Sequence, residues 1–191
     1  KRFLAIHIFI KDMCKTNIKH FNSLIIDKQN KIVERYDPIT IYNMELSKIF
    51  IELDKKLNLL VKEQLPTYKY KTSNDICPLQ GFQSKEENNL LSKRTTRITN
   101  NYVLENDPKG FCGAWNLYYI NMRLKYPDLE PNDLIKKIYS IMENDKHSMR
   151  TFIRNYSMFL VQKADYITKV YKINRNTFNH NIRKYIEEKN L

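Results

Sequence analysis

Two β-rich runs joined by a short polar stretch constrain the fold of this chain more than any other feature. The runs are Phe21–Ile26 and Lys31–Tyr36, and Asp27-Lys28-Gln29-Asn30 separates them. Strand-forming residues on both sides of a polar stretch predict a β-hairpin. If Asp27 and Asn30 flank the turn, the numbers of paired residues sum to 57, and His20 then lies directly opposite Asp37.

Directly opposed residues of a hairpin share one face, with Cβ atoms about 4.5–5.5 Å apart. An imidazole and a carboxylate placed in this way can form a hydrogen bond that fixes the histidine tautomer and stabilises the imidazolium. Glu34 falls on the other face of the hairpin and is a poorer partner for His20, and a slip of the register by one residue would separate His20 from Asp37. No comparable carboxylate partner is expected for the other histidines: His7, His147 and His180.

Cys112 is a candidate nucleophile because of its place in the sequence. It follows the turn signal Asp107-Pro108-Lys109-Gly110 and lies in the apolar, aromatic segment Phe111–Lys125, which predicts a buried helix with the cysteine at its start. The positive end of a helix lowers a thiol pKa from its usual value of about 8.5, and Gly113 lets a substrate backbone approach closely. On its own, Cys112 is equally well interpreted as a small core residue. Together with an imidazole and a carboxylate, it supplies the groups that acyl transfer by cysteine requires.

The remaining pattern indicates an α+β fold, with a small antiparallel sheet packed on helices and a helical C-terminal third. We expect a single domain made of a core, residues 1–128, and a helical extension, residues 129–191. The further elements expected are strands at Arg2–Ile10, near Thr72–Cys77 and near Arg97–Val103, and a helix at Asn43–Leu65 ended by Pro66. From Pro131 onward the chain is expected to be helical throughout, with a cap at Asn132 or Asp133, a break near Asn144-Asp145 and a final helix after Asn174.

Composition limits the class of protein. With 42% hydrophobic and 12% aromatic residues the chain is expected to fold, and no apolar run is long enough to span a membrane. Phe3–Ile10 is too short and too strand-like for a signal peptide. Cys14, Cys77 and Cys112 form no C-x-x-C pair, so neither a disulfide framework nor a zinc site is indicated, and no cofactor is expected. A reducing compartment fits these cysteines best.

A net charge of +12 raises the possibility of a nucleic-acid partner. Arginine and tyrosine together suit phosphate and stacking contacts. The positive charges are spread along the whole chain, and tyrosines at helical spacing are more often core residues. The residues that would form such a surface are Arg150, Arg154, Tyr156, Lys163, Tyr166, Lys169, Tyr171, Lys172, Arg175, Arg183 and Lys184.

The order of His20, Asp37 and Cys112 resembles that of the cysteine peptidases that include the SUMO-specific proteases, the adenovirus protease and their counterparts in large DNA viruses. The resemblance lies in His20–Asp27, Val33–Pro38 and Gly110–Trp115, and it covers roughly His20–Asp128. The last two motifs look most like uncharacterised proteins of large DNA viruses. The resemblance implies a papain-like fold in which the cysteine helix packs against the sheet that bears His and Asp.

The family also implies a glutamine that donates to the oxyanion, a few residues before the cysteine. Asn106 and Asp107 occupy that stretch here. Gln83 is the preferred candidate for this role, with Gln80 and Asn106 as alternatives, and the segment from Ser84 to Lys109 would be an insertion. Where members of the family often carry a tryptophan after the histidine, this chain has Phe21.

These features predict a cysteine peptidase that cleaves after small residues in viral precursor or ubiquitin-like proteins, in the host cytoplasm or the virion. Its catalytic residues would be His20, Asp37, Cys112 and Gln83. The first alternative is an inactive virion or scaffold protein with the peptidase fold. The second is the basic nucleic-acid-binding module.

Overall fold

The computed structural model describes residues 1–11, 19–39, 44–76, 81–83, 111–144 and 148–170. The chain divides into two compact units, Lys1–Ile153 and Arg154–Leu191, and each is described by itself. Several predicted features lie outside the described residues: Cys14, Cys77, Gln80, Asn106, His147, His180, the strand near Arg97–Val103 and the helix after Asn174.

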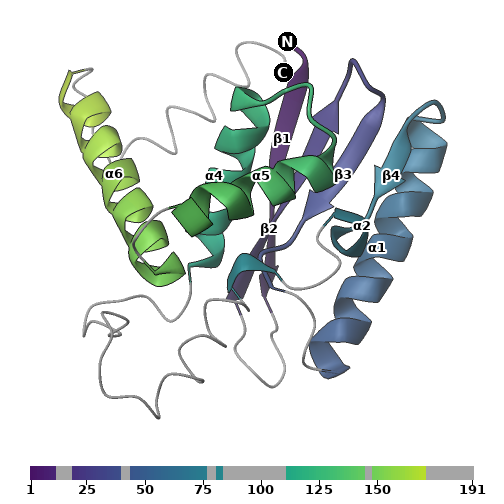
Figure 1. Cartoon of the computed structure of the whole chain (residues 1–191). Coiled ribbons are helices and arrows are strands. Elements are labelled where there is room, and N and C mark those ends of the chain that lie inside the picture. Colours follow the sequence, from purple (N-terminus) through teal and green to yellow (C-terminus); the bar gives the residue numbers. More distant parts are fainter. Residues whose placement is uncertain (12–18, 40–43, 77–80, 84–110, 145–147, 171–191) are drawn as a thin grey trace. The chain divides into compact units, whose positions relative to one another are not determined.

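The first unit contains a four-stranded sheet in the order β1-β2-β3-β4 (Figure 1). The three N-terminal strands pair antiparallel, as predicted, but β4 runs parallel to β3, so the sheet is mixed. A parallel neighbour follows from the long helix α1 (Met44–Gln64) between β3 and β4, because a crossover returns the chain in the same direction. The strands are β1 (Phe3–Lys11), β2 (Lys19–Asp27), β3 (Ile32–Tyr36) and β4 (Lys69–Lys71).

The strand expected near Thr72–Cys77 is wrong, because Ser73–Ile76 form the short helix α2. The Thr72 hydroxyl accepts the backbone N–H of Asp75 at 3.2 Å, while the Asp75 carboxylate accepts the backbone N–H of Thr72 at 2.8 Å. This reciprocal pair is a capping box. It favours a helical turn over an extended conformation at this point.

The register of the β2–β3 hairpin differs from the predicted one. Ser23 pairs with Tyr36 and Asp27 pairs with Ile32, so paired numbers sum to 59 rather than 57. The turn is longer than expected: the Asp27 carboxylate accepts the backbone N–H groups of Gln29 and Asn30, and Lys31 adopts a left-handed conformation with φ of 56°. A shift by two keeps every side chain on its predicted face, since faces alternate with each residue.

The two faces of β3 are covered by different helices. Arg35 bonds to Asp54 of α1, while its neighbour Glu34 bonds to Tyr119 and Arg123 of α4. Successive residues of a strand point to opposite faces, so β3 lies between these helices and all of its residues are buried. The helices are α1 (Met44–Gln64), α4 (Cys112–Lys125), α5 (Pro131–Asn144) and α6 (Met149–Val170).

The helix α4 begins and ends where the sequence predicts. The helix α5 begins at Pro131 itself, so the predicted cap at Asn132 or Asp133 is wrong. Proline is favoured at the first position of a helix because its fixed φ is helical and its missing N–H is not needed there.

Aromatic side chains form the core between the sheet and α4. The rings of Tyr36 and Tyr119 stack with centroids 4.0 Å apart, and Phe82 contacts Trp115 at 5.2 Å. Trp115, Phe82 and Tyr119 have no exposed surface. Close aromatic packing of this kind fixes α4 on the sheet and so fixes the position of Cys112 in the first turn of the helix.

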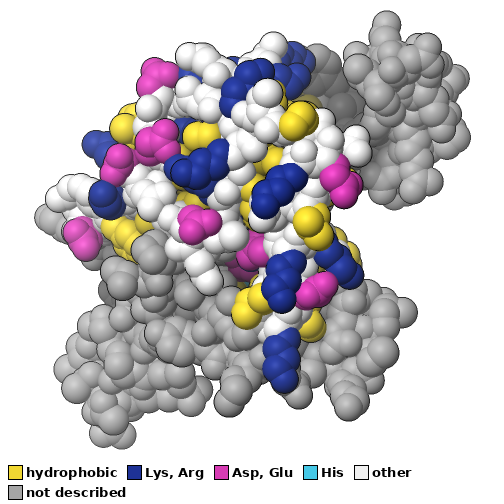
Figure 2. Space-filling model, turned by 90° about the vertical axis from the view of Figure 1, so that its right-hand side faces the viewer, with side chains coloured by type: hydrophobic (Ala, Val, Ile, Leu, Met, Phe, Trp, Pro, Cys, Tyr) yellow, Lys and Arg dark blue, Asp and Glu magenta, His cyan; other side chains and the backbone are white. Residues whose placement is uncertain are grey.

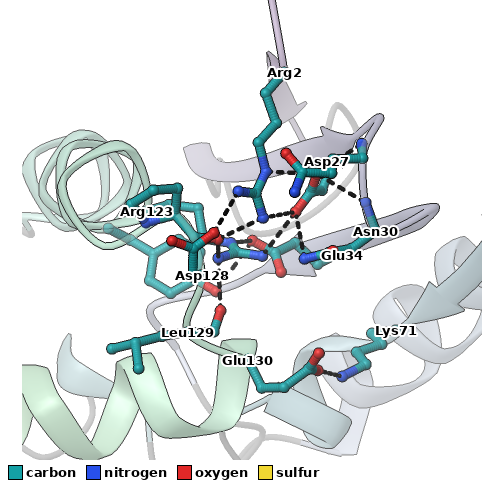
Figure 3. A network of polar contacts seen from close by, with 12 residues as sticks. Arg2, Asp27, Asn30, Glu34, Lys71, Arg123, Asp128, Leu129 and Glu130 are labelled. Atoms are coloured by element: carbon teal, nitrogen blue, oxygen red, sulfur yellow. Dashed lines mark hydrogen bonds and ion pairs between the residues drawn. The ribbon is translucent and has the colours of Figure 1, made fainter.

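A buried network of charged residues joins the N-terminal strand to the far end of α4 (Figure 3). Asp27 accepts two hydrogen bonds from the Arg2 guanidinium, both at 3.0 Å, and Arg123 donates to Glu34 at 3.0 Å. Arg123 also bonds to the carbonyl oxygen of Leu129 at 2.7 Å. These bonds satisfy charges that would be costly if they were buried alone.

Of the residues predicted to form a basic surface, Tyr171, Lys172, Arg175, Arg183 and Lys184 lie outside the described residues, and the described ones are only partly exposed. The side chain of Arg150 is buried, with its guanidinium 5.3 Å from the Phe111 ring, whereas Tyr166 is 63% exposed. On the face in Figure 2, lysine and arginine side chains are interspersed with acidic ones. Within the described segments, no helix is both long enough and apolar enough to cross a lipid bilayer.

Candidate active site

The structure brings His20 and Asp37 together. His20 is the second residue of β2 and Asp37 follows the last residue of β3, so both lie at the same end of the sheet. Nε2 of His20 is 2.8 Å from Oδ1 of Asp37, and both side chains are nearly inaccessible to solvent. Extending the observed register beyond Ser23 and Tyr36 makes His20 and Asp37 diagonal neighbours on one face, not the directly opposed pair that the sequence predicts.

The third predicted residue, Cys112, meets the same imidazole. Burial alone would lower the pKa of His20, but hydrogen bonds with Asp37 and Cys112 outweigh it and raise the pKa to about 9. Burial alone would raise the pKa of the Cys112 thiol, but its hydrogen bond with His20 and those from backbone N–H groups lower it from the ordinary value. Opposite shifts of this kind favour a thiolate–imidazolium pair at neutral pH.

Cys112 is the first residue of α4, and its half-buried sulfur accepts hydrogen bonds from the backbone N–H groups of Phe21 and Gly113. The N-terminal end of a helix carries unpaired N–H groups and a partial positive charge, which stabilise an anion. Among the described residues, a Cβ built on Gly113 would meet the Phe21 ring alone, at 4.0 Å, which is an ordinary van der Waals contact.

Asp37 is held by more than His20. Its Oδ1 also accepts the backbone N–H of Ile39 at 2.9 Å, and its Oδ2 accepts Arg35 Nη1 at 3.1 Å. Arg35 in turn bonds to Asn22 and Asp54. Every bond of this set fixes the orientation of a carboxylate that is only 2% exposed.

Asn116 is a site residue that sequence reasoning missed. Its Nδ2 donates to the carbonyl oxygens of Phe21 at 2.7 Å and Cys112 at 2.8 Å, and the residue is fully buried. This amide ties the first turn of α4 to the strand residue that follows His20. The available signal was a polar residue four positions after Cys112, in the apolar and aromatic first half of the helix.

Gln83 lies beside the same end of the sheet. Its backbone N–H donates to the carbonyl oxygen of Pro38 at 2.9 Å, one residue after Asp37, and its side chain is buried. The preceding Phe82 packs on Trp115, one turn along α4 from Cys112. The contact of Gln83 with Pro38 and that of Phe82 with Trp115 therefore hold Gln83 between the end of β3 and the first turns of α4.

The assembled groups have the chemistry of acyl transfer: a sulfur nucleophile, a base that can hold its proton, and a carboxylate that orients the base. Among the residues that the structure describes, no cluster of three or more histidine, cysteine or acidic side chains is arranged to hold a metal ion. His7 is exposed on β1.

Comparisons with known proteins add two findings. No family model matches the chain. The putative ankyrin repeat protein L371 of Acanthamoeba polyphaga mimivirus is 30% identical over 167 residues, which cover 82% of this chain and 20% of that protein. The chain therefore spans about one fifth of the length of this curated relative.

Solved structures of similar outline come from Chlamydia trachomatis. ChlaDub1 is 16% identical with a TM-score of 0.44, over 84% of this chain and 60% of that one. The effector protein Cdu1, solved bound to ubiquitin, is also 16% identical with a TM-score of 0.44, over 86% and 62% of the two chains.

Proposed function

We propose that this chain is a cysteine peptidase that hydrolyses peptide or isopeptide bonds after small residues, in ubiquitin-like or viral precursor proteins. Cys112 is the nucleophile, His20 is the base and Asp37 orients the base. The observation that carries this proposal is the imidazole of His20, which bonds to the Asp37 carboxylate and to the Cys112 sulfur at once.

In the reaction, the Cys112 thiolate attacks the substrate carbonyl and the bond to the leaving amine breaks as the His20 imidazolium gives the amine a proton. Water, deprotonated by His20, then releases the acyl group from sulfur. The backbone N–H of Cys112 and the side-chain amide of Gln83 stabilise the oxyanion that forms in each step. An inactive protein would have no physical need for an imidazole shared between an acid and a thiol.

The test is covalent labelling by ubiquitin, and separately by SUMO, each carrying a C-terminal electrophile. The expected result is one adduct per chain, at Cys112, which is lost in Cys112→Ala and in His20→Ala while both variants stay folded. Labelling of Cys112→Ala to the same extent would move the nucleophile to another cysteine. Absence of any adduct, together with a Cys112 that alkylates only near pH 9, would favour the inactive scaffold.

A further inference from the structure

Behind the His20–Asp37 pair lies a second layer of charged groups that sequence reasoning did not identify. Arg35, with 1% of its surface exposed, is the centre of this layer. Its Nη1 bonds to Asp37 Oδ2 at 3.1 Å, and its Nε and Nη2 bond to the two carboxylate oxygens of Asp54 at 2.7 and 2.8 Å. A guanidinium that uses two nitrogens on one carboxylate and a third on another has a fixed orientation.

Asp54 belongs to α1 and is itself held from a different strand. The hydroxyl of Tyr70 on β4 donates to Asp54 Oδ1 at 2.6 Å. The ring of Phe50, one turn earlier on α1, lies 5.6 Å from the Arg35 guanidinium and 5.6 Å from the His20 ring. The helix α1 therefore supports both Arg35 and His20 from the same side of the sheet.

We propose that Arg35, clamped by Asp54, is a positioning residue that fixes the Asp37 carboxylate so that Oδ1 is presented to His20. The inference rests on the proposed function, because it assigns a role within the same site. Since Arg35 occupies Oδ2, rotation of the carboxylate would break an ion pair in a region closed to water, where such a break is costly. Asp54 balances the charge of Arg35, which leaves the charge of Asp37 available to the imidazole.

The charge and the position of Arg35 have separable consequences for Cys112. Five other described groups that ionise or carry charge belong to the series of contacts from Arg35 to the sulfur. They are Asp37 beside β3, Asp54 from α1, Tyr70 from β4, His20 from β2 and Cys112 from α4. By electrostatics alone, loss of the Asp54 negative charge would favour the thiolate, so the acid limb of the pH–rate profile of Cys112 would move to lower pH. If Asp37 instead lost its fixed orientation, the imidazolium of His20 would stabilise the thiolate less, and the acid limb would move to higher pH.

The experiment follows the rate of Cys112 alkylation by iodoacetamide against pH, a reaction in which sulfur bonds to the acetamide carbon and iodide leaves. In both Arg35→Met and Asp54→Ala, we expect the acid limb to move up by about one pH unit, which is a tenfold lower rate on that limb. Asp54 is partly exposed, so Asp54→Ala keeps the test available if Arg35→Met does not fold.

A matched control is Arg123→Met, because Arg123 is equally buried, is paired with Glu34 on the other face of β3 and does not contact the site. It should lose stability yet keep the wild-type alkylation profile. A downward shift in Asp54→Ala, or no shift in either variant, would overturn the positioning role. If instead the wild type alkylates with the pH dependence of an isolated thiol, the proposed function itself fails.

Discussion

Nε2 of His20 lies 2.8 Å from Oδ1 of Asp37 although the two residues are not opposed in the hairpin. Extending the β2–β3 register by one residue sets Asn22, not His20, opposite Asp37, and a long side chain can cross the diagonal between His20 and Asp37. The hydrogen bond leaves Nδ1 of His20 for the sulfur. This one contact sets the expected behaviour of the site.

Catalytic activity should show a bell-shaped dependence on pH. The pKa of His20, raised to about 9, keeps the imidazolium protonated up to that pH, and the lowered pKa of Cys112 keeps the sulfur ionised below the usual thiol range. Measured kcat/KM should therefore fall above about pH 9, as the acid that protonates the leaving amine is lost. Activity that keeps rising through pH 10 would show that the imidazolium is not the acid.

Gln83→Ala should reduce kcat by about 10²- to 10³-fold with little change in KM, because an oxyanion donor acts mainly in the transition state. Rates of ester or peptide hydrolysis measure both constants. The matched comparison is Gln80→Ala, which removes the same amide three residues earlier. A loss confined to Gln80→Ala or to Asn106→Ala would transfer the role to that residue.

Asn116→Leu should lower the free energy of unfolding by about 1–3 kcal/mol, because two part-buried carbonyl oxygens lose the donor that the buried Asn116 side chain supplies. Urea unfolding gives this value, and the alkylation rate of Cys112 should fall in the same variant. The neighbouring Leu117 is 40% exposed on the same helix, so Leu117→Ala is the control and should change both quantities little. An Asn116→Leu protein with wild-type stability would show that the two bonds contribute nothing net.

Glu34 should make the protein less stable as the pH rises towards neutrality. Burial raises the pKa of its carboxyl from 4.5 to about 7, against the opposing effect of the Arg123 ion pair. A carboxyl whose pKa is higher in the folded state binds more protons there, so its contribution to stability is present below pH 4.5 and is lost as the pH rises to about 7.

Glu34→Gln removes this titration. Relative to the variant, the wild type should lose up to about 1.4 kcal/mol of unfolding free energy per pH unit within the window from 4.5 to 7. Denaturant unfolding at several pH values measures the difference. Parallel stability curves for the two proteins would contradict the raised pKa.

The local pattern of the sequence was sufficient for the elements that carry the site. Two β-rich runs around a polar stretch predicted β2 and β3, and a turn followed by an apolar segment predicted α4 with Cys112 at its start; all three elements are confirmed. The predicted register was wrong by two residues, but His20 and Asp37 still lie on the same face, because a shift by two residues leaves each side chain on its face.

Tertiary structure alone decided which groups support the site. Arg35 and Asp54 are 19 positions apart and on different elements, and Asn116 is 95 positions from the carbonyl that it binds. No spacing rule connects such residues, because their meeting depends on how α1 and α4 cover opposite faces of β3. The length of the hairpin turn could not be predicted from the sequence either, because it also depends on a distant residue. The Asp27 carboxylate, which Arg2 holds in place, accepts the backbone N–H groups of the turn.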